Sequence, residues 1–215
     1  LCSSAVCRAA SLRSARSGAA PMSPISLTKK GSSENAAVYT QGLSVLHGFA
    51  EYLGQDVFDA AIREYVHRHR DRLVESTDLR RVLEDVSGEH LGWFFDQWVT
   101  GRGTPSFTTE YRYTEATEKE PGSLTVTIEQ TTEDAPFHAP VRIEIGDASG
   151  VTQKTVWVHD GKTALTMPMD APPKWVVVDP NGALIAKWKR KANAVNWEQV
   201  LANSPSPYAR LVALT

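Results

Sequence analysis

The spacing of apolar residues changes close to Pro105. Before it, apolar positions recur every three or four residues, which is typical of helices with one buried face. After it, apolar and polar positions alternate, which is typical of half-buried strands. The helical spacing returns at Val195. The pattern predicts an α+β chain with a helical part, a strand-rich part and a final helical segment.

Four short helices are predicted before Pro105, and their short connections favour antiparallel packing in a small bundle. The first is expected to open after Tyr39 and to bury one stripe of residues, Leu43, Leu46, Ala50 and Leu53, which Val45 and Phe49 widen. The ends of the helices are predicted from the residues that usually cap them, with Gly54 and Gly88 as stops, Asp56 as the cap of the second helix, and Ser76 or Thr77 as the cap of the third. The fourth helix is aromatic, with Phe94, Phe95 and Trp98 in the core.

Seven strand-like runs follow, separated by turn sequences such as Pro121-Gly122. Two of them begin near Phe107 and Leu124, and the others cover residues 141–145, 151–158, 164–167, 175–178 and 184–188. Seven short strands with no helical pattern between them are typical of a β-sandwich. The run 175–178 is apolar throughout, which predicts a central strand covered on both faces.

Composition narrows the classes of function. The chain has 215 residues, 41% of them hydrophobic, and a net charge of −2, which gives no reason to expect a nucleic acid or an anionic membrane as partner. The sequence has no apolar run of the roughly 18 residues that a membrane span needs. Cys2 and Cys7 both lie in the first seven residues, so a disulfide framework is excluded for the rest of the chain.

Residues 1–33 differ in composition from the rest of the chain. They hold five basic residues and no acidic one among many Ser and Ala. We expect a disordered or non-native leader, and the alternative is an organelle transit peptide.

Tyr39 is the candidate for chemistry. It lies in the segment Val-Tyr-Thr-Gln-Gly (38–42), directly before the first predicted helix. At the start of a helix, free backbone N–H groups and the dipole favour negative charge, so a phenol there can donate to an oxyanion. The alternative for a single tyrosine is a packed aromatic side chain at a helix entrance.

Several short segments occur in a definite order: Tyr39-Thr40-Gln41-Gly42, Leu53-Gly54, Thr77-Asp78-Leu79, Phe94-Phe95-Asp96-Gln97-Trp98, Gly103-Thr104-Pro105, Val178-Asp179-Pro180-Asn181 and Lys187-Trp188. In this order they resemble a middle portion of the aminopeptidase N family of zinc metallopeptidases. The resemblance covers about residues 34 to 215. It implies the helical C-terminal part of a thermolysin-like catalytic domain over 34–103, a β-sandwich over 104–191 and the start of a helical repeat domain over 192–215.

By this resemblance Tyr39 matches the family's catalytic tyrosine. Its hydroxyl would donate to the oxyanion of the tetrahedral intermediate, opposite the zinc. Gln41 stands where the family usually has Lys, which removes a charge near the site.

The sequence contains no His-Glu-x-x-His, the motif that supplies two zinc ligands and a general base. His67 and His69 are two residues apart and would face different sides of a helix. The other histidines, His47, His90, His138 and His159, are scattered, and the substrate-amine motif Gly-x-Met-Glu-Asn is also absent. We therefore expect zinc in the intact family enzyme and no metal ligand in this chain.

Two basic clusters have simple structural interpretations. Arg68, Arg70 and Arg72 fit a solvated helix end. A second cluster fits an exposed strand edge that is protected by charge: Lys187, Lys189, Arg190 and Lys191.

The residues support two hypotheses. In the first, the chain is part of a zinc-dependent aminopeptidase that hydrolyses N-terminal residues from peptides, and it is inactive without the missing catalytic half. In the second, it is a non-catalytic binding or scaffold protein derived from the same fold. The first predicts an exposed apolar patch on the helices of 39–100, and the second predicts a polar surface there.

Overall fold

The computed structural model describes residues 34–101, 103–131, 136–191 and 195–214, with only the backbone for 34–40. The predicted leader, 1–33, lies outside the described residues. The chain divides into two compact units, one ending at Thr104 and the other beginning at Pro105. We call them the helical unit and the sheet unit and describe each by itself.

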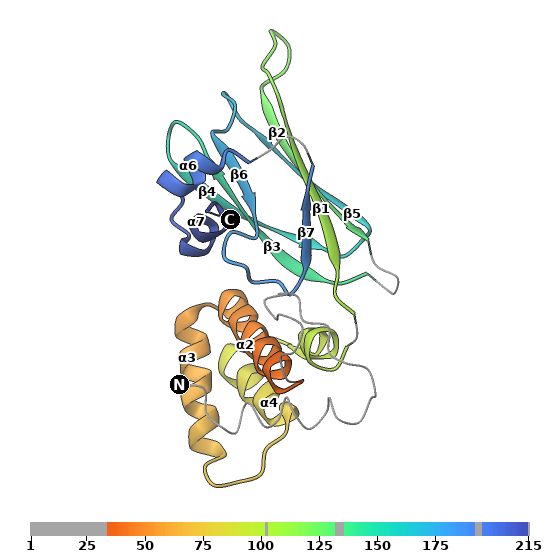
Figure 1. The fold of residues 1–215 in the computed structure, drawn as a ribbon, viewed down its shortest axis with the longest axis vertical. Helices are drawn as coiled ribbons and strands as arrows, with labels where there is room; N and C mark the ends of the chain where they lie inside the picture. The colour runs from red at the N-terminus through yellow and green to blue at the C-terminus, as the bar shows by residue number, and fades with distance from the viewer. Residues whose placement is uncertain (1–33, 102, 132–135, 192–194, 215) are drawn as a thin grey trace. The chain divides into compact units, whose positions relative to one another are not determined.

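The helical unit is built from three helices and a short aromatic segment (Figure 1). These are α2 (Glu34–Leu53), α3 (Gln55–Arg68), α4 (Ser76–Ser87), α5 (Gly92–Phe94) and a π-helical turn, η1 (Phe95–Val99). Gly54 and Gly88 have φ angles of 86° and 74°, and they follow the last residues of α2 and α4. Both predicted stops are therefore confirmed, because glycine enters this region of φ without steric cost.

The predicted caps of the second and third helices are wrong by one or two residues. Gly54 is the N-cap of α3, so Asp56 lies within the first turn instead of capping it. Glu75 is the N-cap of α4 and forms a capping box with Asp78, whose carboxylate accepts the Glu75 N–H at 2.9 Å. A reciprocal pair satisfies two backbone donors at once, which favours Glu75 over Ser76 or Thr77.

The fourth predicted helix is present but distorted. The N–H of Thr100 donates to the carbonyl of Phe95 at 2.9 Å, five residues back, as in a π-helix. Phe94, Phe95 and Trp98 are buried as predicted. A Cβ on Gly101 would collide with the carbonyl oxygens of Gln97 and Asp96, so only glycine fits directly after this turn.

The sheet unit contains two sheets (Figure 1). One has four strands in the order β5-β2-β1-β7 and the other has three in the order β4-β3-β6. The strands are β1 (Ser106–Thr114), β2 (Ser123–Thr131), β3 (Ala139–Gly146), β4 (Val151–Val158), β5 (Lys162–Pro168), β6 (Trp175–Val178) and β7 (Lys187–Arg190). Neighbours are antiparallel except β1 and β7, which are parallel. The α+β class is confirmed, with sheets of four and three strands.

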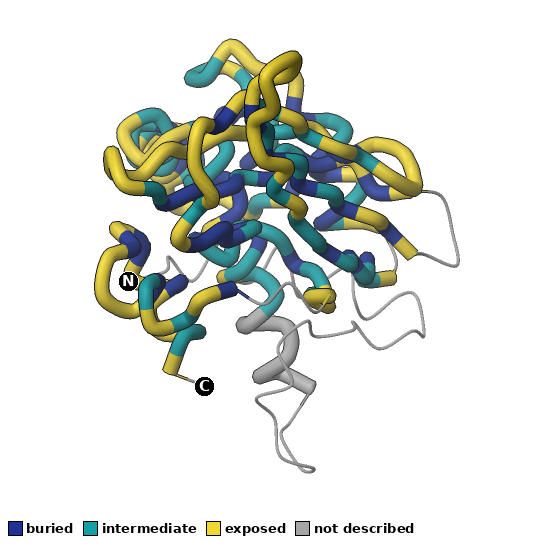
Figure 2. The backbone as a smooth tube through the Cα atoms, turned by 90° about the horizontal axis from the view of Figure 1, so that it is seen from above, coloured by how far each residue is buried: buried dark blue, intermediate teal, exposed yellow. Residues whose placement is uncertain are grey.

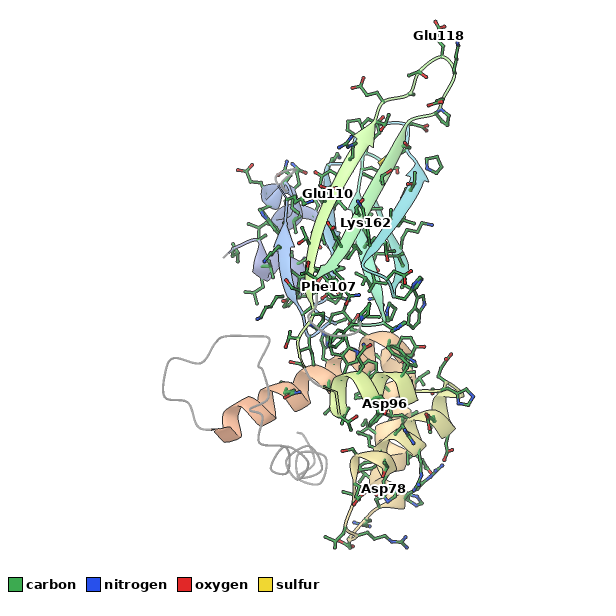
Figure 3. The ribbon with its side chains drawn as sticks, turned by 90° about the vertical axis from the view of Figure 1, so that its right-hand side faces the viewer. Asp78, Asp96, Phe107, Glu110, Glu118 and Lys162 are labelled. Atoms are coloured by element: carbon green, nitrogen blue, oxygen red, sulfur yellow. The ribbon has the colours of Figure 1, made fainter. Side chains whose placement is uncertain are left out.

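Alternation of buried and exposed residues marks the core of this unit (Figure 2). On β2, Leu124, Val126 and Ile128 are buried and the residues between them are partly exposed. Phe107 on β1 is buried and stacks on Trp188 of β7 at 4.9 Å between ring centroids. Figure 3 shows Glu118 at the far end of the β1–β2 hairpin, away from this core.

The prediction for the apolar run 175–178 is right about burial and wrong about position. Trp175, Val176 and Val177 are all buried, so β6 is covered on both faces as expected. It lies at an edge of its sheet, however, and is not a central strand. The helices α6 (Trp197–Asn203) and α7 (Pro207–Val212) supply the cover, since Val200 and Ala209 join Trp175 and Val177 in one cluster.

The last strand is three residues later than predicted at its start. The carboxylate of Asp179, at a φ of 53°, accepts the N–H of Ala183 at 2.8 Å and of Leu184 at 3.3 Å. The backbone N–H groups of residues 183 and 184 are bonded within this turn and cannot join the sheet ladder. β7 therefore begins only at Lys187. The structure describes no helix long and apolar enough to cross a bilayer.

Candidate functional site

Tyr39 lies in the second turn of α2, which already begins at Glu34. The prediction that it stands at the start of the helix is therefore wrong. Glu34, Asn35 and two alanines extend the helix toward the N-terminus, and alanine is the best helix former. The free N–H groups of the first turn belong to residues before Tyr39, so any role of this residue rests on its hydroxyl and not on the helix end. The side chain of Tyr39 lies outside the described residues.

The buried face of α2 is confirmed for the two residues that widen the predicted stripe, Val45 and Phe49, and is wrong for Leu43. Val45 and Phe49 are buried, and the Phe49 ring stacks on Phe94 at 4.0 Å and lies 5.1 Å from Phe95. Of the predicted stripe, Leu43 is 66% exposed and the other three residues are only half-buried. The large aromatic surface of Phe49 decides the orientation of the helix, because it buries more area than a leucine does.

Leu43 and Leu46 follow position 39 by four and seven residues, spacings that put positions on one side of an α-helix. Leu43 is mostly exposed and Leu46 is half-buried. The candidate catalytic position therefore shares its helix register with two apolar residues, of which only Leu43 is mostly exposed.

The neighbouring helices are joined by charge as well as by packing. Arg68 at the end of α3 donates to Glu64 at 2.6 Å and pairs with Asp85 of α4. These carboxylates raise the pKa of the guanidinium. Arg68 therefore links two helices, and only part of its cluster is a solvated helix end. The ion pair between Glu64 and Arg68 could have been predicted from their spacing of four residues on one helix. The pair with Asp85 could not, because that residue lies on another helix.

A buried phenol lies between α3 and α4. Tyr65 is 1% exposed, and its hydroxyl has no hydrogen-bond partner within the described part of the chain. Burial, with a smaller contribution from the charge of Asp78, raises the pKa of Tyr65 above its ordinary value. Its ring lies 5.1 Å from the ring of His69, tilted by 42°, so the described contacts of this phenol are aromatic packing.

The described residues do not form a metal centre: they contain no group of three or more His, Cys, Asp or Glu side chains that could hold an ion. His67 lies in the last turn of α3 and His69 is the C-cap of that helix. His159 Nδ1 contacts Asp160 at 2.8 Å, and its ring lies 6.4 Å from that of His138, both in the sheet unit. His67, His138 and His159 are exposed and His69 is half-buried, and the described contacts do not gather these side chains around a common point.

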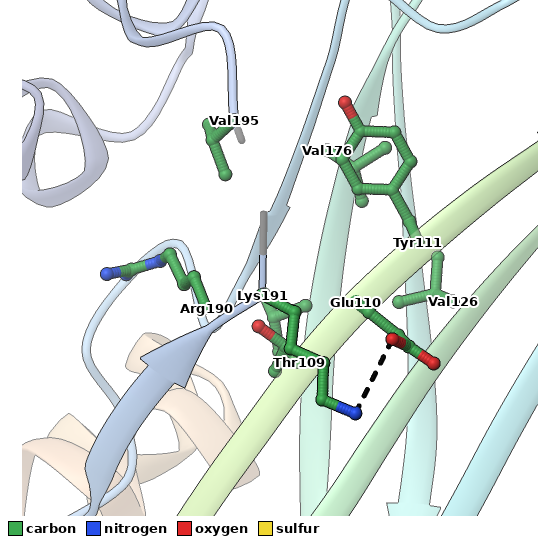
Figure 4. A pocket seen from close by; sticks show the side chains of 9 residues that line it. Thr109, Glu110, Tyr111, Val126, Val176, Arg190, Lys191 and Val195 are labelled. Atoms are coloured by element: carbon green, nitrogen blue, oxygen red, sulfur yellow. Dashed lines mark ion pairs between the residues drawn. The ribbon is translucent and has the colours of Figure 1, made fainter. Parts of the chain in front are cut away.

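The sheet unit has a small pocket near the end of β7 (Figure 4). Lys191 contacts Glu110 at 3.6 Å and Glu129 at 3.9 Å, so its ammonium group is already paired. Burial raises the pKa of Tyr111, which lines the pocket beside Val126. The described residues that line it include no histidine or cysteine. The pocket is therefore a small gap between packed strands that contains an ion-paired lysine, and it lacks the features of a catalytic cleft.

The basic cluster of β7 has the predicted place at a sheet edge. Arg190 also lies over the ring of Trp197 at 5.0 Å, a cation–π contact that joins the strand to α6. Sequence reasoning missed this contact because the two residues approach only after α6 folds back on the sheet.

Known proteins resemble this chain over parts of their length. The model of the peptidase family M1 domain matches residues 18–98. Aminopeptidase N of Escherichia coli K12 is 29% identical over 137 residues, which cover 60% of this chain and 15% of that protein. Tricorn protease-interacting factor F2 of Thermoplasma acidophilum is 33% identical over 67 residues, 31% of this chain and 9% of that protein.

A solved structure matches both units. Aminopeptidase A of Legionella pneumophila, in complex with aspartic acid, has a TM-score of 0.67 and 16% sequence identity over 97% of this chain and 26% of its own. At this identity the likeness shows the fold alone. The chain thus spans about a quarter or less of the length of the relatives it matches.

Proposed function

We propose that this chain, which belongs to peptidase family M1, forms part of a zinc-dependent aminopeptidase that releases N-terminal residues from peptides. The observation that carries the proposal is the family match over residues 18–98, which includes α2 and Tyr39. The names of the relatives, aminopeptidase N and aminopeptidase A, support a peptide as the substrate.

The role that we propose for Tyr39 is to donate its hydroxyl to the oxyanion of the tetrahedral intermediate. The family match over residues 18–98, which includes this position on α2, supports the role. One such donor contributes a factor on the order of a hundred to a thousand in rate.

Zinc is the metal that the family resemblance implies. The side chains described in this chain do not fit it, since they include no suitable group of three ligands. We therefore derive no step through the metal, and we propose that its ligands and the general base come from residues other than those described. Without them we expect the chain to be inactive.

We also propose an assignment of the chain to three domains of such an enzyme. Residues 34–103 would complete the catalytic domain, the two sheets of 104–191 would form its β-sandwich neighbour, and residues 192–215, with α6 and α7, would begin a helical repeat domain. The exposed apolar residues Leu43 on α2 and Leu211 on α7, 66% and 60% exposed, support surfaces that further parts of such an enzyme cover.

The test begins with the chain as it stands. We expect neither stoichiometric zinc binding nor release of the chromophore from an alanine p-nitroanilide. Tight zinc binding by the chain alone would mean that it contains ligands outside the described residues. The coding sequence upstream is then read in all frames for His-Glu-x-x-His, and the longer polypeptide is expressed.

In that longer polypeptide, Tyr39→Phe is expected to lower kcat by roughly a hundredfold or more with little change in KM or zinc content. Tyr52→Phe is the matched control, because it removes a hydroxyl from the same helix in the aromatic cluster with Trp93. Full activity of Tyr39→Phe, or equal losses in both variants, would contradict the proposed role.

A further inference from the structure

Three phenylalanines hold the C-terminal half of α2 in the helical unit. Phe49 of α2 is fully buried, and its ring lies 4.0 Å from the ring of Phe94 and 5.1 Å from that of Phe95. Among the side chains that the structure describes on α2, none other is buried as fully, since Val45 is 9% exposed. The orientation of α2 within this unit therefore depends chiefly on one set of aromatic contacts.

The two partners of Phe49 lie where the α-helical turn α5 passes into the π-helical turn η1. Successive residues of an α-helix point about 100° apart, yet Phe94 and Phe95 both contact the same ring. Thr100 closes the turn behind them: its N–H donates to the carbonyl of Phe95 at 2.9 Å, and its hydroxyl donates to the same oxygen at 3.3 Å. Figure 3 labels Asp96 on this segment. Single π-helical turns occur frequently at functional sites, which directs attention to what this one holds in place.

The candidate catalytic position lies on the same helix, well away from this contact. Phe49 follows Tyr39 by ten residues, which corresponds to about 15 Å of α-helix. A tilt of α2 about Phe49 by about 4° therefore moves residue 39 by about 1 Å. A misplacement of about 1 Å at a catalytic group lowers the rate by as much as roughly a hundredfold. A small change at Phe49 is thus amplified at Tyr39.

We propose that Phe49, through its contact with Phe94 and Phe95, is a positioning residue that sets where the hydroxyl of Tyr39 lies in the active enzyme. This role rests on the proposed function of Tyr39 as the oxyanion donor. Phe49 does not touch the substrate and acts only through the direction of α2. Its removal therefore lowers kcat by less than removal of the Tyr39 hydroxyl does.

The first test uses the longer polypeptide in which Tyr39→Phe is measured. Phe49→Leu keeps an apolar side chain and removes the ring contact, so it is expected to lower kcat by about tenfold with little change in KM or zinc content. Leu83→Ala is the matched control, because it removes a fully buried side chain from α4 of the same unit. It is expected to lower the melting temperature at least as much and to leave kcat unchanged.

Removal of the same contact from its other side gives an independent check. Phe94→Leu is expected to lower kcat by a factor similar to that of Phe49→Leu. The two substitutions together are expected to cost little more than either alone, because both remove one contact. Losses that simply multiply would show that the two rings act separately and would overturn the proposal.

A double-mutant cycle separates positioning from a general loss of packing. If Phe49 acts through Tyr39, Phe49→Leu lowers kcat by about tenfold when the hydroxyl is present and has almost no effect in a Tyr39→Phe background. The same factor in both backgrounds would mean that Phe49 has a structural role unrelated to Tyr39, and the proposal would be wrong.

The two proposals fail in different ways. If Tyr39→Phe leaves kcat unchanged, the role of Tyr39 is wrong and the role of Phe49 falls with it. If Tyr39→Phe lowers kcat as expected and Phe49→Leu does not lower it, the positioning role alone is wrong.

A second measurement does not depend on activity. Residual dipolar couplings of the backbone amides, recorded on the chain as it stands, report the angle between α2 and α3. Phe49→Leu is expected to change this angle by a few degrees, whereas Leu83→Ala is expected to leave it as in the wild type. An unchanged angle in Phe49→Leu would overturn the proposal.

Discussion

The two units differ in how they treat polar groups in their interiors. In the sheet unit, Glu144 is fully buried, and its carboxylate accepts from the indole N–H of Trp175 at 3.2 Å and from Gln153 at 3.4 Å. Gln130 bonds both backbone groups of Phe137, at 2.8 and 3.1 Å. In the helical unit, the buried hydroxyl of Tyr65 has no partner in the described part of the chain, and Leu43 of α2 is mostly exposed.

The difference teaches which unit satisfies its buried polar groups from its own residues. A buried polar group without a partner costs stability. The sheet unit pairs Glu144 and Gln130 internally, although it also exposes apolar side chains such as Leu211. The helical unit leaves the Tyr65 hydroxyl without a partner among the described residues.

The largest expected effect is in the sheet unit. A Cβ on Gly146 would collide with the indole of Trp175, so Gly146→Ala is expected to destabilise this unit by roughly 3 kcal/mol, near the upper end of overpacking costs. Gly161→Ala is the control, because a Cβ there meets open space. Denaturant unfolding followed by hydrogen exchange reports each unit separately. A similar loss in the helical unit would show that the two units are not independent.

A smaller loss is expected at the buried carboxylate. Glu144→Leu leaves the Trp175 N–H buried without an acceptor, which costs about 1 to 2 kcal/mol. Glu144→Gln keeps an oxygen toward the indole and is expected to retain most of the stability. Equal losses in the two variants would mean that charge, and not the hydrogen bond, is what this site requires. The measurement is the denaturant midpoint of the sheet unit.

The smallest effect is expected in the helical unit. Tyr65→Phe removes a hydroxyl that has no described partner, so the free energy of unfolding is expected to change by less than about 0.5 kcal/mol or to rise slightly. Burial raises the pKa of Tyr65 in the folded state, so folding favours the neutral phenol. The wild type should therefore lose stability as pH rises above 10.0, and Tyr65→Phe should lack that part of the loss. A marked destabilisation by Tyr65→Phe at neutral pH would reveal a partner for the hydroxyl.

Much of the element order was accessible from the sequence. The stops at Gly54 and Gly88, the run that forms β6 and the buried aromatic residues of 94–98 all follow from local rules. The position of the candidate site residue within its helix was harder to predict from the sequence. Tyr39 was expected at a helix start, yet the helix already begins at Glu34, because two alanines continue it without adding to the apolar stripe that defined the prediction.

The sequence by itself determined where helices and strands lie, because capping, glycine geometry and apolar period act within a few residues. Only the tertiary structure decided which part of each predicted face is buried. Phe49 stacks on Phe94 while Leu43 of the same predicted stripe is mostly exposed, and α6 and α7 cover β6 at the edge of its sheet. Each of these outcomes depends on surfaces that meet across long stretches of chain, and the larger apolar area gained there outweighs the local pattern.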